Sequence, residues 1–233
     1  MISKLCEYNR RSEFILKVLS DMLKENPNQQ VMILAHNKNL LKYLHDAVAH
    51  RNIATVGYYV GGMKESALKE TESKKVVIAT YAMAAEALDI KTLTTLIMAT
   101  PKTDIEQSVG RILREKHSNP IVVDIVDSHD LFKNQWRKRK TFYKKENYKI
   151  IYTISTNYTT DYSKWTLIYN PNPDGPKECK SKKSKKAISV KSNSSSDKSI
   201  THESEPEDDN EEPEPASKSD KYVCEVCYLK VNK

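Results

Sequence analysis

The sequence is short of glycine: only five of its 233 residues are glycine. Loops that cradle phosphate groups need several, because the backbone must approach the ligand closely. Most of the glycines stand in the stretch Gly57-Tyr-Tyr-Val-Gly61-Gly62-Met63-Lys64. There Met63 occupies the position at which a Walker A loop requires lysine, and Lys64 the position that requires a hydroxyl. This stretch is therefore either a turn or a loop that contacts another ligand, and the sequence holds no Walker A loop.

Cysteine is also scarce, with four residues, and no apolar run is long enough to cross a membrane. We also expect no leader peptide, which favours an intracellular protein with reduced thiols and no membrane partner. Cys224 and Cys227 have the C-x-x-C spacing of zinc sites, but a tetrahedral Zn²⁺ site needs two further ligands. The pair could supply half of a zinc site completed by a partner, and we expect no other metal ligands.

Short apolar runs alternate with helical patterns over the first two thirds of the chain. Runs rich in β-branched residues predict buried strands at Val31–Ala35, Val76–Thr80, Thr95–Thr100 and Ile121–Val126. Apolar residues at helical spacing lie before the first of them, from Phe14 to Leu23, and after it, from Leu40 to Val48. This order predicts an α/β fold: a parallel sheet with helices on both faces, whose ligands lie beyond the carboxyl ends of the strands.

One segment, Thr103 to Arg114 (TDIEQSVGRILR), concentrates residues that suit an anionic ligand. A capping box of Thr103 and Glu106 predicts the start of a helix. The spacing Gln-x-x-Gly-Arg-x-x-Arg then brings Gln107, Arg111 and Arg114 close together, with Gly110 allowing close approach. Two guanidinium groups directed at one place suit a triphosphate, although two surface arginines on a solvated helix would have the same spacing.

In this order the segments resemble the second RecA-like domain of superfamily 2 helicases, a fold of the P-loop NTPase type. VMILAHNKNLL resembles motif IV, VVIATYAMAAEALDIKTLTTLIMAT resembles motif V, and DIEQSVGRILR resembles motif VI. The wording of motif VI is closer to DNA-repair and large-DNA-virus helicases than to DEAD-box RNA helicases. The resemblance covers roughly residues 10–150, favours DNA over RNA as the nucleic acid, and is compatible with a nucleus or a viral replication site.

The resemblance also implies roles for individual residues. Arg111 and Arg114 would be arginine fingers that stabilise charge on the γ-phosphate of ATP. The other residues implied in the nucleotide site are Gln107, Gly110, Glu86 and Asp89. The residues expected to contact nucleic acid are His36, Asn37, Gly61, Gly62, Lys64 and Thr80. One departure is Ala87, which stands where the family usually has glycine and makes close backbone approach at that loop less easy.

The sequence also lacks a Walker B pair, because no glutamate is adjacent to Asp124 or Asp127. In helicases the first RecA-like domain holds Mg²⁺ and ATP and supplies the base. The resemblance therefore implies half of an ATP site, completed by a first RecA-like domain. Since Met1 stands near the expected domain boundary, we expect that domain to be a separate polypeptide, a split-off gene segment or lost.

Positive charge is concentrated in the first 170 residues, which hold 26 Lys+Arg against 18 Asp+Glu. The densest run, Lys133 to Lys149, interleaves cations with Trp136, Phe142, Tyr143 and Tyr148. We expect its apolar side to pack on the sheet, and its cations to be either a solvated helix face or a nucleic-acid footprint on which exposed aromatic rings stack bases. The predicted contacts in this run are Arg137, Lys138, Arg139 and Lys140.

The composition changes near residue 170, where Pro, Ser, Lys and Glu become dominant. Such a segment buries too little apolar surface to offset its ordering entropy. The chain is thus predicted to contain a helicase C-terminal RecA-like domain (1–165), a disordered charged linker (166–220) and a short terminus with the C-x-x-C pair (221–233). Lys180–Lys186 could bind nucleic acid or pair with the acidic block Glu205–Pro215.

Two functions follow from these patterns. The first is the C-terminal half of an ATP-dependent superfamily 2 helicase, which supplies arginine fingers and nucleic-acid contacts and depends on a partner domain for catalysis. The second is a non-catalytic nucleic-acid-binding or scaffold remnant of a helicase. A Walker A segment encoded upstream of this chain would favour the first.

Overall fold

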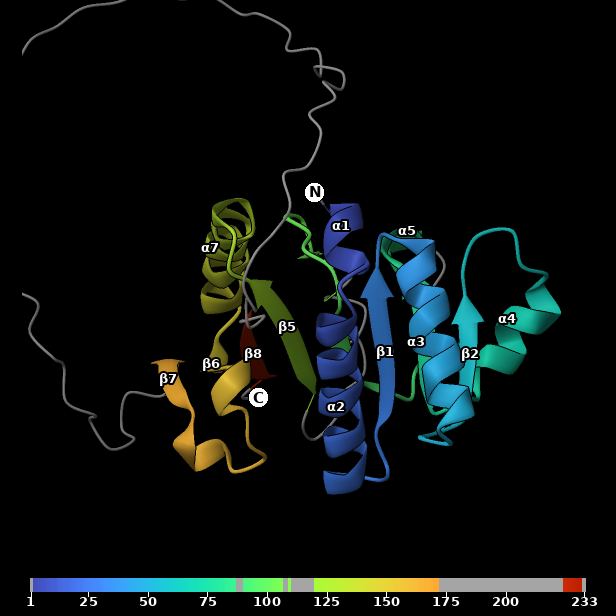
Figure 1. Ribbon diagram of the computed structural model, residues 1–233, viewed down its shortest axis with the longest axis horizontal. Helices are drawn as coiled ribbons and strands as arrows, with labels where there is room; N and C mark the ends of the chain where they lie inside the picture. The colour runs from blue at the N-terminus through green and yellow to red at the C-terminus, as the bar shows by residue number, and fades with distance from the viewer. Residues whose placement is uncertain (1, 87–89, 107–108, 110–119, 172–223, 232–233) are drawn as a thin grey trace, which may run out of the picture. The chain divides into compact units, whose positions relative to one another are not determined.

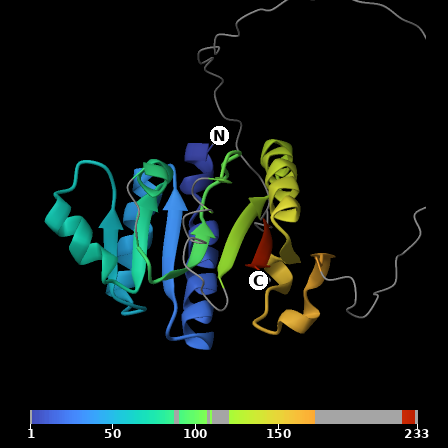
Figure 2. The same ribbon diagram turned by 180° about the vertical axis from the view of Figure 1, so that it is seen from behind.

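The computed structural model describes residues 2–86, 90–106, 109, 120–171 and 224–231. Within them, helices cover both faces of one eight-stranded sheet (Figure 1 and Figure 2). The elements are α1 (Ile2–Cys6), α2 (Asn9–Glu25), β1 (Gln30–Ala35), α3 (Lys38–His50), β2 (Val56–Tyr59), α4 (Glu65–Glu72), β3 (Val76–Thr80), α5 (Tyr81–Glu86), β4 (Leu93–Met98), β5 (Ile121–Asp127), α7 (Asp130–Lys145), β6 (Tyr148–Ile154), the 3₁₀ turns η1 (Ser155–Asn157) and η2 (Tyr162–Lys164), β7 (Thr166–Tyr169) and β8 (Cys224–Val231).

The strand order in the sheet is β2-β3-β1-β4-β5-β8-β6-β7. Every pair among the first five strands is parallel, and β1 lies between β3 and β4. The predicted α/β class with a parallel sheet is therefore confirmed, and all four predicted strands form. In such a sheet the carboxyl ends of all five parallel strands lie along one edge, where a ligand site is expected.

Apolar side chains of β1 alternate between two cores, one on each face of the sheet. Val31 and Ile33 pack with α2 and α3, whereas Met32 and Leu34 pack with α5 and α7. Figure 1 shows α2 and α3 in front of the sheet, and Figure 2 shows the opposite face. Because both faces are covered, the strand is a continuous apolar run rather than an alternating one.

The short strand β2 was not predicted, because its four residues include a glycine and two tyrosines. Gly57 is required there by close packing against α4. A Cβ atom at Gly57 would lie 2.8 Å from the Oγ1 of Thr71, which is closer than real Cβ contacts allow. The glycine therefore lets α4 lie against β2.

The largest departure from the predicted domain organisation is β8. The sequence suggested a separate terminus at 221–233, but Cys224–Val231 lies inside the sheet, antiparallel to both β5 and β6. Its side chains at Cys224, Val226, Cys227, Tyr228 and Leu229 are 0–1% exposed. The insertion also makes β6 an internal strand, and β7 carries the sheet beyond the predicted domain boundary at residue 165, to Tyr169.

The tyrosine-rich segment after β6 covers β8 on one face. The ring centroids of Trp165 and Tyr228 are 4.8 Å apart at an interplanar angle of 85°, and those of Tyr162 and Tyr228 are 5.1 Å apart. Tyr158 packs edge-on against Trp165 at 5.8 Å. Edge-to-face rings of this kind add to the stabilisation from buried area, so this segment helps to hold β8 in place.

Two buried ion pairs fix helices to opposite faces of β5. Arg11 of α2 donates two hydrogen bonds to Asp127, at 2.8 and 2.9 Å. Arg139 of α7 donates two to Asp124, at 2.7 and 2.9 Å. Since Asp124 and Asp127 are three residues apart on a strand, they face opposite sides of the sheet. Bidentate geometry of this kind is what makes buried charges tolerable.

Candidate nucleic-acid interface

The carboxyl edge of the parallel strands gathers most of the described residues that were predicted to contact nucleic acid. His36 and Asn37 follow β1, Thr80 is the last residue of β3, and Gly61 and Gly62 follow β2. Because β2, β3 and β1 are neighbours in the sheet, these loops are adjacent. The order of strands therefore brings together residues that are up to 44 positions apart in the sequence.

His36 is exposed, and its position is fixed by its neighbours. Its backbone N–H donates to the Oγ1 of Thr100 at 3.0 Å, and its ring lies 4.6 Å from the ring of Tyr81. Partial desolvation, together with the nearby charge of Lys102, lowers the pKa of His36 below its usual 6.5. The imidazole is therefore neutral at pH 7 and can act as a hydrogen-bond donor or acceptor rather than as a cation.

Lys102, which follows β4 by four residues, was not recognised from the sequence. Its Nζ lies 5.0 Å from the ring centroid of Tyr81, a cation–π distance. His36 and Lys102 thus flank the same ring, with one neutral and one charged group at this edge of the sheet. The rule that identified His36 was to look for a polar residue directly after a buried strand. It would also have found Lys102 if the predicted strand Thr95–Thr100 had been extended by Pro101.

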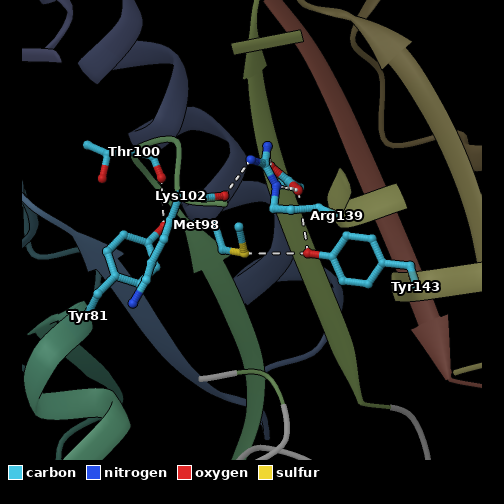
Figure 3. A network of polar contacts seen from close by, with 7 residues as sticks. Tyr81, Met98, Thr100, Lys102, Arg139 and Tyr143 are labelled. Atoms are coloured by element: carbon cyan, nitrogen blue, oxygen red, sulfur yellow. Dashed lines mark hydrogen bonds and ion pairs between the residues drawn. The ribbon is translucent and has the colours of Figure 1, made fainter. Parts of the chain in front are cut away.

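Two side chains hold the backbone that leads from β4 into the segment predicted to carry the arginine fingers (Figure 3). The hydroxyl of Tyr81 donates to the carbonyl oxygen of Thr100 at 2.6 Å. Arg139 Nη1 donates to the carbonyl oxygen of Lys102 at 2.7 Å. Tyr81 begins α5 and Arg139 lies on α7, so both helices position this connection.

The hydrogen-bond network of Arg139 continues into the core through Tyr143. Tyr143 directs its hydroxyl toward the Sδ of Met98 at 3.5 Å and toward Asp124 Oδ2 at 3.4 Å. Burial raises the pKa of Tyr143 well above its usual value, and the charge of Asp124 raises it further. The phenol therefore stays protonated and serves as a donor throughout the physiological range.

The prediction that Arg139 contacts nucleic acid is wrong, because its side chain is occupied within the fold. It is 1% exposed and its donors are bonded to Asp124 and to Lys102. The prediction of exposed aromatic rings in this run is also wrong for Trp136, Tyr143 and Tyr148, which are buried. Helical periodicity places every third or fourth residue of α7 against the sheet, and Trp136, Arg139 and Tyr143 fall on that side, whereas Tyr148 is the first residue of β6.

The other cations of the run remain available. Arg137 and Lys138 are exposed and Lys140 is half-buried. Arg137 donates to the Oδ1 of Asn134 at 2.6 Å, one turn earlier on α7. His129 is the N-cap of α7, and its Nδ1 accepts from the N–H of Leu131 at 3.2 Å.

Several predicted contacts also have local structural roles. The side-chain oxygen of Asn37 caps α3 by accepting from the N–H groups of Asn39 and Leu40. The hydroxyl of Thr80 accepts weakly from the N–H of Met83 at 3.4 Å. Gly62 has φ = 86°, which a side chain would strain. Lys64, in contrast, is exposed and its side chain does not cap α4, so its ammonium group is available to a ligand.

The expected nucleotide-site residues lie almost entirely outside the described residues. These are Gln107, Gly110, Arg111, Arg114 and Asp89; Glu86 ends α5, but its side chain is not described. Glu106, next to this segment, donates its N–H to the Oδ1 of Asp104 at 3.4 Å, at the place where a capping box was expected.

Cys224 and Cys227 cannot jointly bind one metal ion in this arrangement. They are three residues apart on β8, so their side chains enter different cores: Cys224 packs with the α2 side and Cys227 with the α7 side. Among the residues that the structure describes, no group of three or more His, Cys, Asp or Glu side chains could hold a metal. The predicted zinc half-site is therefore corrected to two core thiols.

The parallel sheet covered by helices defines a RecA-like domain. The edge formed by the carboxyl ends of its parallel strands carries side chains suited to a polyanion. Residues 14–116 match the model of the helicase conserved C-terminal domain family. This match confirms the predicted resemblance to the C-terminal, second RecA-like domain of superfamily 2 helicases. In the described part of the chain, no helix is long and apolar enough to span a membrane.

The curated relatives are proteins of large DNA viruses. The chain is 39% identical over 174 residues to a protein of Acanthamoeba polyphaga mimivirus named for an ATP-dependent RNA helicase, a match that covers 71% of this chain and 33% of that protein. An African swine fever virus protein with the same description is 30% identical over 152 residues, a match that covers 60% of this chain and 29% of that protein. Uncharacterized protein 108L of Invertebrate iridescent virus 3 is 35% identical over 78 residues, a match that covers 33% of this chain and 75% of that protein. The chain thus spans about a third of the length of the two named helicases.

Proposed function

We propose that this chain is the second RecA-like half of an ATP-dependent nucleic-acid helicase. In this proposal a first RecA-like domain holds Mg²⁺ and ATP, and Arg111 and Arg114 complete the site as arginine fingers. Gln107, Gly110, Glu86 and Asp89 lie around the nucleotide. The observation that carries the proposal is the anchored edge of a helicase-family fold: Tyr81 and Arg139 hold the backbone just before the finger segment.

The nucleic acid would lie along the carboxyl edge. His36, Lys64, Thr80 and Lys102 offer donors and charge there, and the exposed cations of α7 add to the positive potential. A single strand bound mainly through its phosphates shows little sequence preference and a steep dependence on salt. The names of two relatives support RNA as the nucleic acid, whereas the sequence of motif VI favours DNA. The test therefore includes both single-stranded RNA and single-stranded DNA.

The experiment joins this chain to the first RecA-like domain of a related helicase and measures ATP hydrolysis with and without single-stranded RNA or DNA. Hydrolysis stimulated by nucleic acid is expected. Arg111→Lys or Arg114→Lys should each reduce the rate on the order of 10³-fold, because lysine keeps the charge but not the bidentate fork. The matched control is Arg51→Lys, which changes an arginine that pairs with Glu13 outside the proposed site and should leave the rate unchanged.

Three outcomes separate the alternatives. A joined protein indifferent to both substitutions would contradict the assignment of the fingers. Vigorous hydrolysis by the isolated chain would contradict the division of the ATP site between two domains. Salt-dependent binding without hydrolysis, in the presence of a competent first domain, would instead indicate the non-catalytic nucleic-acid-binding protein.

A further inference from the structure

A cavity of about 340 Å³ lies between α3 and the loop that follows β2. Its volume is at the lower end of the range for small-ligand sites, so it suits one planar group rather than a stack of several. The lining is almost entirely apolar and open to solvent on one side. The lining residues are Lys38, Leu41, Lys42, Tyr58, Val60 and Met63.

The walls are formed in advance of any ligand. Leu41 belongs to the core and is 1% exposed. The N–H of Val60 lies 3.5 Å from the Sδ of Met63, a contact that folds the glycine loop back on itself. Behind Tyr58, the ring of His45 stacks at 4.0 Å with an interplanar angle of 14° and does not itself line the cavity. A ring supported in this way is a rigid wall.

The rim carries two lysines one helical turn apart, Lys38 and Lys42, both exposed. Neither forms an ion pair with any described residue, whereas Lys69 and Lys74 each pair with a glutamate one turn away. No acidic side chain lines the cavity. The charge at the rim is therefore available to an anionic ligand whose apolar part enters the cavity.

The position of the cavity connects it to the proposed nucleic-acid surface. Lys38 directly follows the His36–Asn37 loop, and Val60 and Met63 enclose Gly61 and Gly62. The two loops that flank the cavity are thus the two loops already expected to meet the nucleic-acid strand. A protein segment with an apolar side chain between acidic residues would also fit the chemistry, but nothing about the location favours it.

We propose that this cavity seats one unstacked nucleobase of a bound single strand, with the neighbouring phosphates on Lys38 and Lys42. This inference rests on the proposed function and adds to it a site for a base. Every base has an apolar face, and an open cavity leaves its polar edges in water. Because the lining offers almost no donors or acceptors, the seat accepts any base and gives affinity without sequence preference.

The test compares two fluorescein-labelled probes on the full chain by fluorescence anisotropy at fixed salt. One is a 12-nucleotide oligothymidylate, and the other is the same backbone with every base replaced by an abasic tetrahydrofuran unit. The complete strand should bind roughly 5- to 100-fold more tightly, the range that removal of a stacked base produces. Met63→Ala should reduce this ratio severalfold, and so should Val60→Phe, which fills the cavity.

The controls separate the seat from the fold and from the phosphate contacts. Leu167→Ala replaces a half-buried side chain on β7, the strand at the opposite edge of the sheet, and should leave the ratio unchanged. Lys42→Gln should weaken both probes equally. Thermal melting checks that each variant is folded.

The possible results distinguish failure of the proposed nucleic-acid function from failure of the base-binding cavity. If neither probe binds, the proposed nucleic-acid function fails and the base seat fails with it. If both probes bind equally, or if the ratio persists in Met63→Ala and Val60→Phe, the base seat alone is overturned. In that case the cavity would be left to an apolar segment of a protein partner.

Discussion

The two halves of the sheet are built in different ways. Strands β1 to β5 are parallel, come from residues 30–127, and alternate with helices along the chain. Strands β8, β6 and β7 are joined by antiparallel pairing, and β8, which links them to β5, comes from residues 224–231. The first half depends on connections between neighbours in sequence, and the second on the pairing of one distant segment, β8, with both β5 and β6. The proposed contacts at the carboxyl edge lie on the first half, while the second half completes its core.

The two halves meet at β5, which has a buried carboxylate for each face. Asp127 holds α2, a helix of the parallel half, and Asp124 holds α7, the helix that precedes β6. In the pairing with β8, Asp124 is opposite Cys227 and Asp127 is opposite Cys224. The cysteines that suggested a metal site are thus the neighbours of the two ion pairs, and burial beside them explains small apolar side chains at those positions.

Removal of residues 221–233 should have the largest effect. It exposes the edges of β5 and β6 and deletes five fully buried side chains, a cost on the order of 10 kcal/mol, which is comparable to the whole stability of a typical domain. The truncated chain should show no cooperative thermal unfolding by circular dichroism. Internal deletion of Glu205–Pro215 is the control and should shift Tm by less than about 2 °C. Equal melting temperatures for the truncated and full chains would contradict the role of β8.

Breaking either ion pair of β5 should come next. Arg139→Met leaves Asp124 buried without its partner and should reduce the free energy of unfolding by about 3–5 kcal/mol in urea titrations. Arg11→Met should do the same to Asp127. Adding Asp124→Leu to Arg139→Met should restore most of the stability, because the uncompensated charge is then gone. A double variant as unstable as the single one would mean that the pair acts through packing alone.

Replacement of the exposed α7 cations should weaken nucleic-acid binding without altering the fold. In the triple variant Arg137→Gln, Lys138→Gln and Lys140→Gln, the slope of log affinity against log salt should fall by about 0.7–0.9 for each phosphate that the variant no longer neutralises. The matched control is Lys164→Gln, whose lysine pairs with Asp161 outside the proposed surface. A triple variant with the wild-type slope would show that these cations are only a solvated helix face.

The smallest effect concerns a surface contact between α2 and α3. Arg51 and Tyr43 lower the pKa of Glu13 from 4.5 to about 2. The folded state therefore holds the ionised form more strongly than the unfolded chain does. The resulting stabilisation is present above pH 4.5 and is lost as pH falls through about 2. Since both partners are nearly half exposed, Glu13→Gln should cost at most about 1 kcal/mol at pH 7, and this cost should disappear as the pH falls through about 2. A cost that is constant with pH would contradict this linkage.

Local patterns in the sequence were enough to predict the parallel half of the fold and the resemblance to helicase C-terminal domains. Apolar runs such as Val31–Ala35 and Val76–Thr80 are buried on both faces, so their composition indicates strands, and their alternation with helices indicates a parallel sheet. The ligand edge followed from the same reasoning, which is why His36 and Thr80 were placed correctly at the ends of their strands. Each of these patterns is carried by residues that are neighbours along the chain.

Contacts between segments that are far apart in the sequence were decided by the tertiary structure alone. Arg139 has the sequence context of one more cation in a basic run, and its burial depends on which turn of α7 meets Asp124 on another element. Cys224 and Cys227 have the spacing of a metal pair, but β8 lies between β5 and β6, where alternation along a strand separates them. A pairing between residues 121–127 and 224–231 leaves no period or spacing in the sequence, because it depends on long-range packing rather than on local chain geometry.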